Sequence, residues 1–149
     1  MKSRWTAAAL AALALAAAAA PAWAADKIKV GFLSTLSGPG GALGVDIRDG
    51  FQLAIKHRSG KLGGLPVEPS VVDDQQNADT GRQAVERMLK RDKVDVMTGM
   101  VFSNVLLPIM PSILANDTIY LSTNTGPAEY AGDKCNKNFF AVAWQDEGI

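Results

Sequence analysis

Reactive side chains are scarce in this sequence of 149 residues, which contains one cysteine, Cys135, and one histidine, His57. A single cysteine excludes a disulfide framework within the chain. A single histidine near the exposed end of a predicted helix provides neither a metal-ligand set nor a base beside a nucleophile. An excess of one charge is also missing, since 15 basic residues balance 15 acidic ones. The composition therefore indicates no nucleic-acid partner, no anionic membrane surface and no cofactor.

The first 25 residues have the pattern of a secretory signal peptide. Lys2 and Arg4 precede the apolar run "AAALAALALAAAAA", and "AWA" before Ala25 is a small-x-small cleavage pattern. The run is mostly alanine and Pro21 follows it, which argues against a transmembrane anchor. We therefore expect residues 1–25 to be removed on export, leaving residues 26–149 with a net charge of −2.

Strand-forming and helix-forming stretches alternate along the rest of the chain. Strands are predicted over 28–33, 65–72, 94–99, 118–122 and 139–143, and helices over 46–59, around 80–91 and over 104–116. This alternation predicts an α/β fold with an open parallel sheet and helices on both of its faces. Two prolines in the second strand favour an edge position, and Pro111 is expected to kink or delay the third helix.

The last residues, "NFFAVAWQDEGI", predict a strand, a turn and the start of a helix with Asp146 as its N-cap. A domain rarely ends one residue into a helix, so we expect an incomplete fold.

The glycine-rich segment "STLSGPGGALG", residues 34–44, raises the possibility of a phosphate-binding loop. A P-loop requires Gly-Lys-Ser/Thr, but Gly44 is followed by Val45. The dinucleotide fingerprint requires glycines at i, i+2 and i+5, but counting from Gly38 the last of these is Leu43. Both nucleotide-binding motifs are absent, so the glycines indicate a tight turn.

The ends of the predicted strands carry most of the polar residues suited to binding. In an open parallel sheet, ligands bind outside the carboxyl ends of the strands. Ser103 follows the third strand and opens a helix, whose free N–H groups favour an anion. The sequence therefore predicts a site for a carboxylate or a similar small anion. Asp73 and Asp74 are interpreted as turn and capping residues, and Cys135 as structural.

Several of these segments resemble one known family. The motifs, in order, are "IKVGFLSTLSGPGGALG", "DIRDGFQLAI", "VVDDQQNADTGRQAVERML", "VDVMTGMVFSNVLLP" and "YLSTNTGPAEYAG". Together they resemble the N-terminal lobe of a type I periplasmic substrate-binding protein, of the leucine/isoleucine/valine-binding type that serves ABC importers. The resemblance implies residues 26–149 as one lobe of a two-lobed protein that closes on a small ligand.

The resemblance also implies which residues meet the ligand. They are Val101, Phe102 and Ser103 after the third strand, Thr123, Asn124 and Thr125 after the fourth, and Leu43 in the glycine loop. Trp144 joins them because it follows the fifth predicted strand, at the edge where a ligand is expected. Ser103, with neighbouring main-chain groups, would hold a ligand carboxylate. Many members carry an arginine where this chain reads Ala141 to Trp144, so an aromatic or apolar carboxylate is as plausible as a branched-chain amino acid.

The implied protein is a non-catalytic, periplasmic receptor whose partner is a membrane permease. Two alternatives remain from the residues alone. One is an exported α/β enzyme that uses Asp73 and Asp74 or Cys135, although the sequence offers few side chains that could act as a base or bind a metal. The other is a ligand sensor with the same fold, because more than one partner can read the closure of two lobes.

Overall fold

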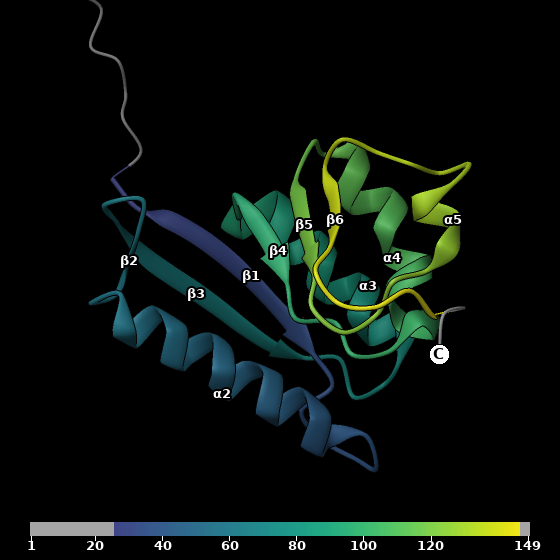
Figure 1. Cartoon of the computed structure of the whole chain (residues 1–149), viewed down its shortest axis with the longest axis horizontal. Coiled ribbons are helices and arrows are strands. Elements are labelled where there is room, and N and C mark those ends of the chain that lie inside the picture. The colour runs from purple at the N-terminus through teal and green to yellow at the C-terminus, as the bar shows by residue number, and fades with distance from the viewer. Residues whose placement is uncertain (1–25, 147–149) are drawn as a thin grey trace, which may run out of the picture.

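The computed structural model describes residues 26–146, so the predicted signal peptide and the last three residues lie outside the described part. The strands are β1 (Ile28–Ser34), β2 (Lys61–Leu62), β3 (Leu65–Asp73), β4 (Val96–Thr98), β5 (Ile119–Ser122) and β6 (Phe139–Ala141). The helices are α2 (Gly41–His57), α3 (Ala78–Arg87) with a π-helical turn η1 (Met88–Asp92), α4 (Ser103–Ala115) and α5 (Ala128–Ala131). Figure 1 shows their arrangement.

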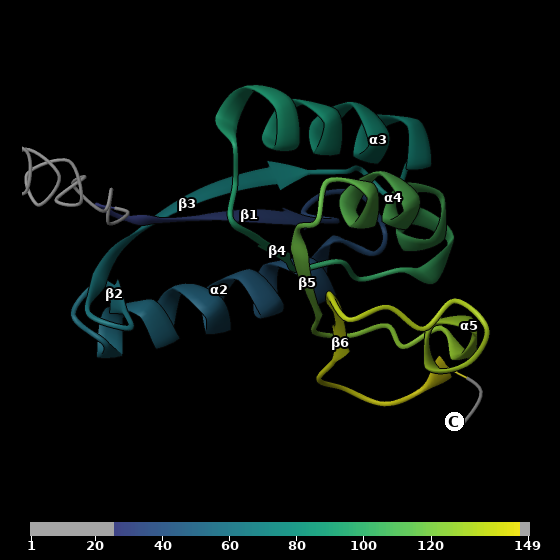
Figure 2. The ribbon, with the colours of Figure 1, turned by 90° about the horizontal axis from the view of Figure 1, so that it is seen from above.

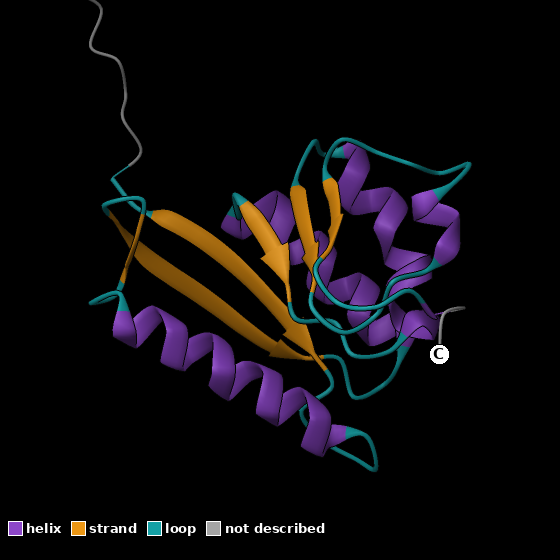
Figure 3. Ribbon diagram, viewed as in Figure 1, coloured by secondary structure: helices purple, strands orange, loops and turns teal. Residues whose placement is uncertain are grey.

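The strands form one sheet in the order β2-β3-β1-β4-β5-β6. All neighbouring strands are parallel except β2, which forms a short antiparallel pair with the start of β3. In Figure 3 the arrowheads of the parallel strands point toward the same edge of the sheet. The predicted edge position of β3 is largely confirmed, because β2 covers only Leu65 and Pro66. The sequence did not predict β2.

Helices lie on both faces of the sheet, as Figure 2 shows, with α2 on one side and α3 and α4 on the other. The main core lies between the sheet and helices α3 and α4. Its almost fully buried residues include Leu33, Val85, Met97, Leu106 and Tyr120. On the opposite face Phe51 of α2 stacks on Phe32, with ring centroids 5.1 Å apart. The predicted α/β class, with an open and mainly parallel sheet, is confirmed.

Helix α2 begins at Gly41, five residues before the predicted start, so the second half of the glycine segment is helical. The early start depends on Gly44, because a Cβ there would lie 1.8 Å from the carbonyl oxygen of Thr35. The glycine thus lets the helix pack against the end of β1. The prediction of a loop through residue 44 was wrong, since periodicity does not reveal such a close approach.

Helix α4 runs without delay through Pro108 and Pro111. Neither proline donates a backbone hydrogen bond inside the helix, which normally destabilises it. Burial of one face compensates, and the fully buried residues of that face are Val105, Leu106, Ile109, Met110 and Ile113. The expected delay at Pro111 was wrong because tertiary packing outweighs the local preference.

Within residues 26–146, no helix has the length and apolarity needed to cross a membrane. The same part of the chain contains no group of three or more histidine, cysteine or acidic side chains placed to hold a metal ion.

Candidate functional site

The loops that follow β4 and β5 meet at the carboxyl edge of the sheet. The Asn124 side chain donates a hydrogen bond of 2.8 Å to the carbonyl oxygen of Val101, which joins the two loops. Val101 is buried, and Phe102 follows it in an extended conformation as the N-cap residue of α4. Ser103 is the first residue of that helix. The structure thus brings together four residues that the sequence assigned to one site, Val101, Phe102, Ser103 and Asn124.

A third loop, after β6, reaches the same place through Asp146. Its carboxylate accepts a hydrogen bond from the Ser103 hydroxyl and a second bond of 2.8 Å from the backbone N–H of Gly126. The backbone N–H of Asp146 in turn donates to the Gly126 carbonyl oxygen at 3.0 Å. The expected N-cap role of Asp146 concerned residues 147–149, which lie outside the described part. In the described structure its carboxylate links two loops.

The glycine segment is held by the two aspartates at the end of β3. Asp73 accepts hydrogen bonds of 2.8 Å from the backbone N–H groups of Leu36 and Gln75. Asp74 accepts from the Thr35 hydroxyl at 2.6 Å and from the Gln76 N–H at 2.8 Å. These contacts agree with the interpretation of Asp73 and Asp74 as turn residues.

The environments of these two aspartates shift their pKa values in opposite directions. Desolvation raises the pKa of Asp74, and the hydrogen bonds from Thr35 and Gln76 only partly offset it. Desolvation also acts to raise the pKa of Asp73, but hydrogen bonds from Ser37, Leu36 and Gln75 outweigh it and leave that pKa below its usual value. The environment of Asp73 therefore stabilises its carboxylate form, whereas that of Asp74 destabilises the carboxylate relative to water.

Phe102 connects the glycine segment to the β4–α4 loop. A Cβ built on Gly40 would lie 2.5 Å from the Phe102 ring and 3.1 Å from the Gln76 side-chain oxygen. The ring also packs against the core cluster. Phe102 from the loop after β4 and Gln76 from the loop after β3 therefore both lie close to Gly40 in the loop after β1.

The remaining predicted site residues differ in exposure. Thr125 is 2% exposed, and the hydroxyls of Thr123 and Thr125 are buried without a hydrogen-bond partner among the described residues. Leu43 and Trp144 are 52% and 54% exposed. Leu43 lies in the first turn of α2 rather than in a loop. The structure shows no contact that brings Leu43 to the other site residues.

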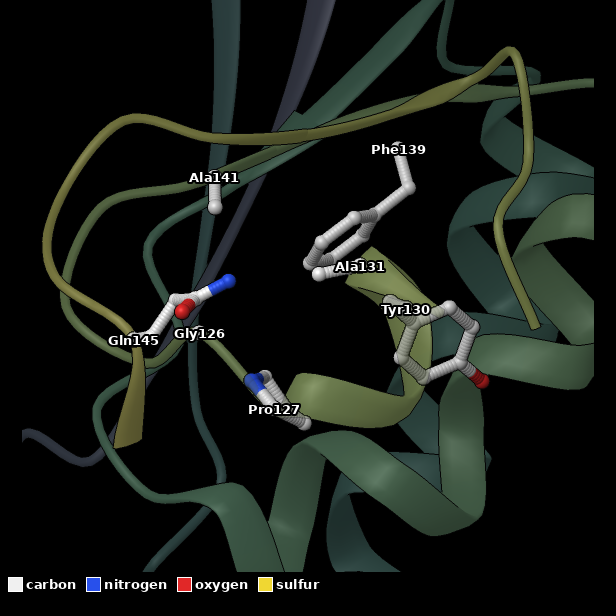
Figure 4. Close-up of a pocket in the computed structure, with 7 residues that line it drawn as sticks. All are labelled: Gly126, Pro127, Tyr130, Ala131, Phe139, Ala141 and Gln145. Atoms are coloured by element: carbon white, nitrogen blue, oxygen red, sulfur yellow. The ribbon is translucent and has the colours of Figure 1, made fainter. Parts of the chain in front are cut away.

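A separate cavity of about 190 Å³ lies between β6, α5 and the loop before α5. Figure 4 shows the Tyr130 and Phe139 rings on one side of it and Gln145 on the other. These two rings are 4.9 Å apart between centroids. None of the eight predicted site residues lines this cavity. Gly126, which binds Asp146, does line it, so the cavity borders the candidate site without coinciding with it.

Two features of the site were missed by sequence reasoning. One is the use of Asp146 between loops, and the other is the attachment of the glycine segment to both Asp73 and Asp74. The position of Asp146 just beyond a strand end was a usable signal, because the ends of parallel strands share one edge of the sheet.

A model of the periplasmic binding protein family matches residues 27–148. The chain belongs to the periplasmic binding protein family. Its solved neighbours include type I members of ABC transporters, among them branched-chain amino acid binders, so the resemblance identified from the sequence is confirmed. A search of curated proteins found no significant match to this chain.

Three solved structures illustrate the similarity of this periplasmic binding protein to others. A solute-binding protein of an R. palustris ABC transporter, in complex with benzoate, has a TM-score of 0.78 and 26% identity, over 83% of this chain and 34% of that one. An ABC transporter substrate-binding protein from Sphaerobacter thermophilus has a TM-score of 0.72 and 26% identity, over 76% and 31%. A leucine-binding protein from Thermotoga maritima, with a TM-score of 0.73 and 21% identity over 80% and 33%, shows the fold alone.

The chain thus spans about a third of the length of the structures that it matches. Its fold is that of one incomplete lobe of a type I periplasmic binding protein. The neighbours named here are binding proteins of transporters rather than enzymes.

Proposed function

We propose that this chain is the N-terminal lobe of the extracytoplasmic solute-binding component of an ABC importer. It captures a small ligand that carries a carboxylate, either an amino acid or an aromatic or apolar acid, and delivers it to a membrane permease. Residues 1–25 direct export to the periplasm, and residues 26–149 form one of two lobes that close on the ligand.

The observation that carries this proposal is the meeting of the β4–α4 and β5–α5 loops at the head of α4. The Asn124 to Val101 bond holds these loops together. The first N–H groups of a helix have no partner within the helix, and the helix dipole favours a negative charge beside them. The hydroxyls of Thr123 and Thr125, which are buried without a hydrogen-bond partner among the described residues, would add donors from the neighbouring loop. Together these groups suit a small anion.

We propose that Phe102, Leu43 and Trp144 contact the apolar part of the ligand. Phe102 lies close to Gly40 of the glycine segment, and the other two present exposed apolar side chains that a second lobe would cover. Among the solved neighbours, two R. palustris proteins are complexes with benzoate and 4-hydroxybenzoate, and another neighbour is a complex with isoleucine. Both ligand classes are therefore tested below.

The first experiment is a ligand screen on the full-length, two-lobed protein that this proposal implies. Leucine, isoleucine, benzoate and 4-hydroxybenzoate are compared with benzamide as an uncharged control. A ligand at about 100 times its Kd stabilises the folded state by about 2.7 kcal/mol, which appears as a raised Tm. A rise with at least one acid but not with benzamide is expected. No rise with any acid would contradict the proposed ligand class.

A second experiment tests the head of α4. In the full-length protein Ser103→Ala should weaken binding of the active acid at least tenfold, or about 1.4 kcal/mol, because the bond that ties the first turn of α4 to Asp146 is lost and the N–H groups of that turn are held less firmly. Ser112→Ala on the same helix is the matched control and should leave the affinity unchanged. Equal affinities of the wild type and Ser103→Ala by calorimetry would remove Ser103 from the site.

A third experiment tests the two-lobe proposal. Residues 26–149 alone should bind the active acid poorly, because one wall of the cleft is missing. Binding by this segment as tight as by the full-length protein would contradict the second lobe's contribution.

No observation favours the alternative of an enzyme. The described contacts of Asp73 and Asp74 are hydrogen bonds from loop backbone and hydroxyl groups. Cys135 lies exposed in the turn after α5.

A further inference from the structure

Asp146 contacts both of the loops that form the proposed anion site. Its carboxylate binds Ser103, 43 residues earlier in the sequence, and the N–H of Gly126, 20 residues earlier. Neither contact belongs to the regular pairing of β5 with β6, which ends at Ser122 and Ala141. Asp146 thus adds a side-chain connection where the strand ladder has ended.

The backbone around Asp146 fixes the position of its carboxylate. The Asp146 N–H donates to the Gly126 carbonyl oxygen at 3.0 Å, so main chain and side chain hold the same residue from two directions. A Cβ on Gly126 would lie 2.2 Å from the Trp144 carbonyl oxygen. The β5–α5 loop and the segment after β6 therefore approach each other so closely at Gly126 that no side chain fits there.

The carboxylate of Asp146 is the acceptor in both of its side-chain hydrogen bonds. An ionised carboxylate only accepts hydrogen bonds, so the Ser103 hydroxyl is the donor in this pair. Such charge-assisted bonds are stronger than bonds between neutral groups. The carboxylate therefore fixes the rotamer of Ser103 and links the first turn of α4 to the β5–α5 loop.

We propose that Asp146 is a positioning residue that holds the β4–α4, β5–α5 and post-β6 loops together as one rigid wall of the cleft. The three bonds that join Asp146 to Ser103 and Gly126 are called the Asp146 clasp. The clasp itself stands on the described contacts. Its consequence for ligand affinity rests on the proposed function.

The structural test uses hydrogen exchange and three variants of the full chain. Asp146→Ala removes both side-chain bonds. Asp146→Asn keeps an oxygen that accepts from Gly126 and an amide that donates to the Ser103 oxygen. Asp133→Ala removes an exposed aspartate in the turn after α5 and serves as the matched control.

The Gly126 amide should exchange about tenfold faster or more in Asp146→Ala, because local opening no longer breaks a charge-assisted bond. Asp146→Asn should stay within about threefold of the wild type, since neutral bonds replace charged ones. Asp133→Ala should match the wild type. Equal exchange in Asp146→Ala and the wild type, or equal acceleration in Asp133→Ala, would overturn the clasp.

If Asp146→Ala does not fold, Ser103→Ala replaces it in this test, because it removes only one bond of the clasp. Gly126 exchange should then rise about threefold, as expected when a carboxylate loses one of its two anchors. Unchanged exchange in that variant would overturn the proposal.

The binding test uses calorimetry with leucine and with benzoate on the full-length protein. Asp146→Ala should weaken the ligand that binds by about tenfold, and Asp146→Asn should restore most of the affinity. Loss of the clasp without loss of affinity would overturn the positioning role. If the wild type binds neither acid while the exchange pattern is as expected, the clasp stands and the proposed ligand class fails.

Discussion

The hydroxyl of Thr35 donates a hydrogen bond of 2.6 Å to the carboxyl group of Asp74, 39 residues further along the chain. Both side chains are fully buried. The second oxygen of Asp74 has no hydrogen-bond partner among the described residues. This pair links the loop after β1 to the turn after β3 and places a buried ionisable group between them.

The burial of Asp74 predicts that the contribution of this group to stability falls as the pH rises. Burial raises the pKa of Asp74 above the ordinary value of 3.8, so the folded state keeps the proton when the unfolded state has released it. The contribution of this group is fully present below that value and is lost as the pH rises through the folded pKa. In Asp74→Asn the group no longer titrates. In urea unfolding at about pH 4, 5.5 and 7, the free energy of unfolding of Asp74→Asn should therefore increase relative to that of the wild type as the pH rises. Parallel pH profiles of the two proteins would contradict this assignment.

Asp73 predicts the opposite pH dependence. Its folded pKa lies below the ordinary value of 3.8, so its contribution is present above that value and is lost as the pH falls through the folded pKa. Asp73→Asn should cost about 1 kcal/mol at neutral pH, because neutral bonds replace two bonds to a carboxylate. The difference from the wild type should shrink in acid. A deficit that stays constant down to about pH 2 would show that the charge of Asp73 is unimportant.

Two glycines of α2 provide a matched test of the fold. Gly44→Ala should destabilise the chain by about 2 kcal/mol or more, because its Cβ would meet the Thr35 carbonyl oxygen at 1.8 Å. Gly50→Ala should stabilise it by about 0.5–1 kcal/mol, since alanine favours the helix and the space there is open within 4 Å. Thermal and urea unfolding measure both changes. Equal effects of the two substitutions would exclude a specific role for Gly44.

Thr125 tests the separation of binding from stability. In Thr125→Val a buried hydroxyl without a partner among the described residues is replaced by a methyl group of similar size. The free energy of unfolding should change by less than about 0.5 kcal/mol, whereas ligand affinity should fall about tenfold. A large loss of stability would show that Thr125 is structural.

Thr98→Val is the control for that experiment. It removes a hydroxyl that donates to the Leu121 carbonyl oxygen at 2.7 Å. This variant should lose about 1 kcal/mol of stability and keep its affinity for ligand.

Much of the architecture was predictable because it depends on local patterns. The five parallel strands followed from short apolar runs, and the helices between them followed from the spacing of apolar residues. The start of α2 and the continuation of α4 through Pro111 were not predictable. Both depend on contacts with distant elements, namely Thr35 for Gly44 and the buried core for α4.

The candidate site divides in the same way. The residue types at the strand ends were readable from the sequence, since the carboxyl ends of parallel strands must share an edge. The partners of those residues were not. Asn124 binds Val101, Thr35 binds Asp74, and Asp146 binds Ser103. Each of these bonds joins loops separated by more than twenty residues, so the spacing of residues in the sequence does not predict it.

The sequence by itself determined the fold class, the edge of the sheet that carries the polar groups, and the resemblance to periplasmic binding proteins. The first two depend on the periodicity of apolar residues within short segments, and the resemblance depends on the order of the quoted motifs along the chain. The tertiary structure alone decided which loops touch, which hydroxyls are buried, and that Asp146 lies between Ser103 and Gly126. Those outcomes depend on how distant segments pack, because hydrogen bonds are formed only between groups that the finished fold brings within reach.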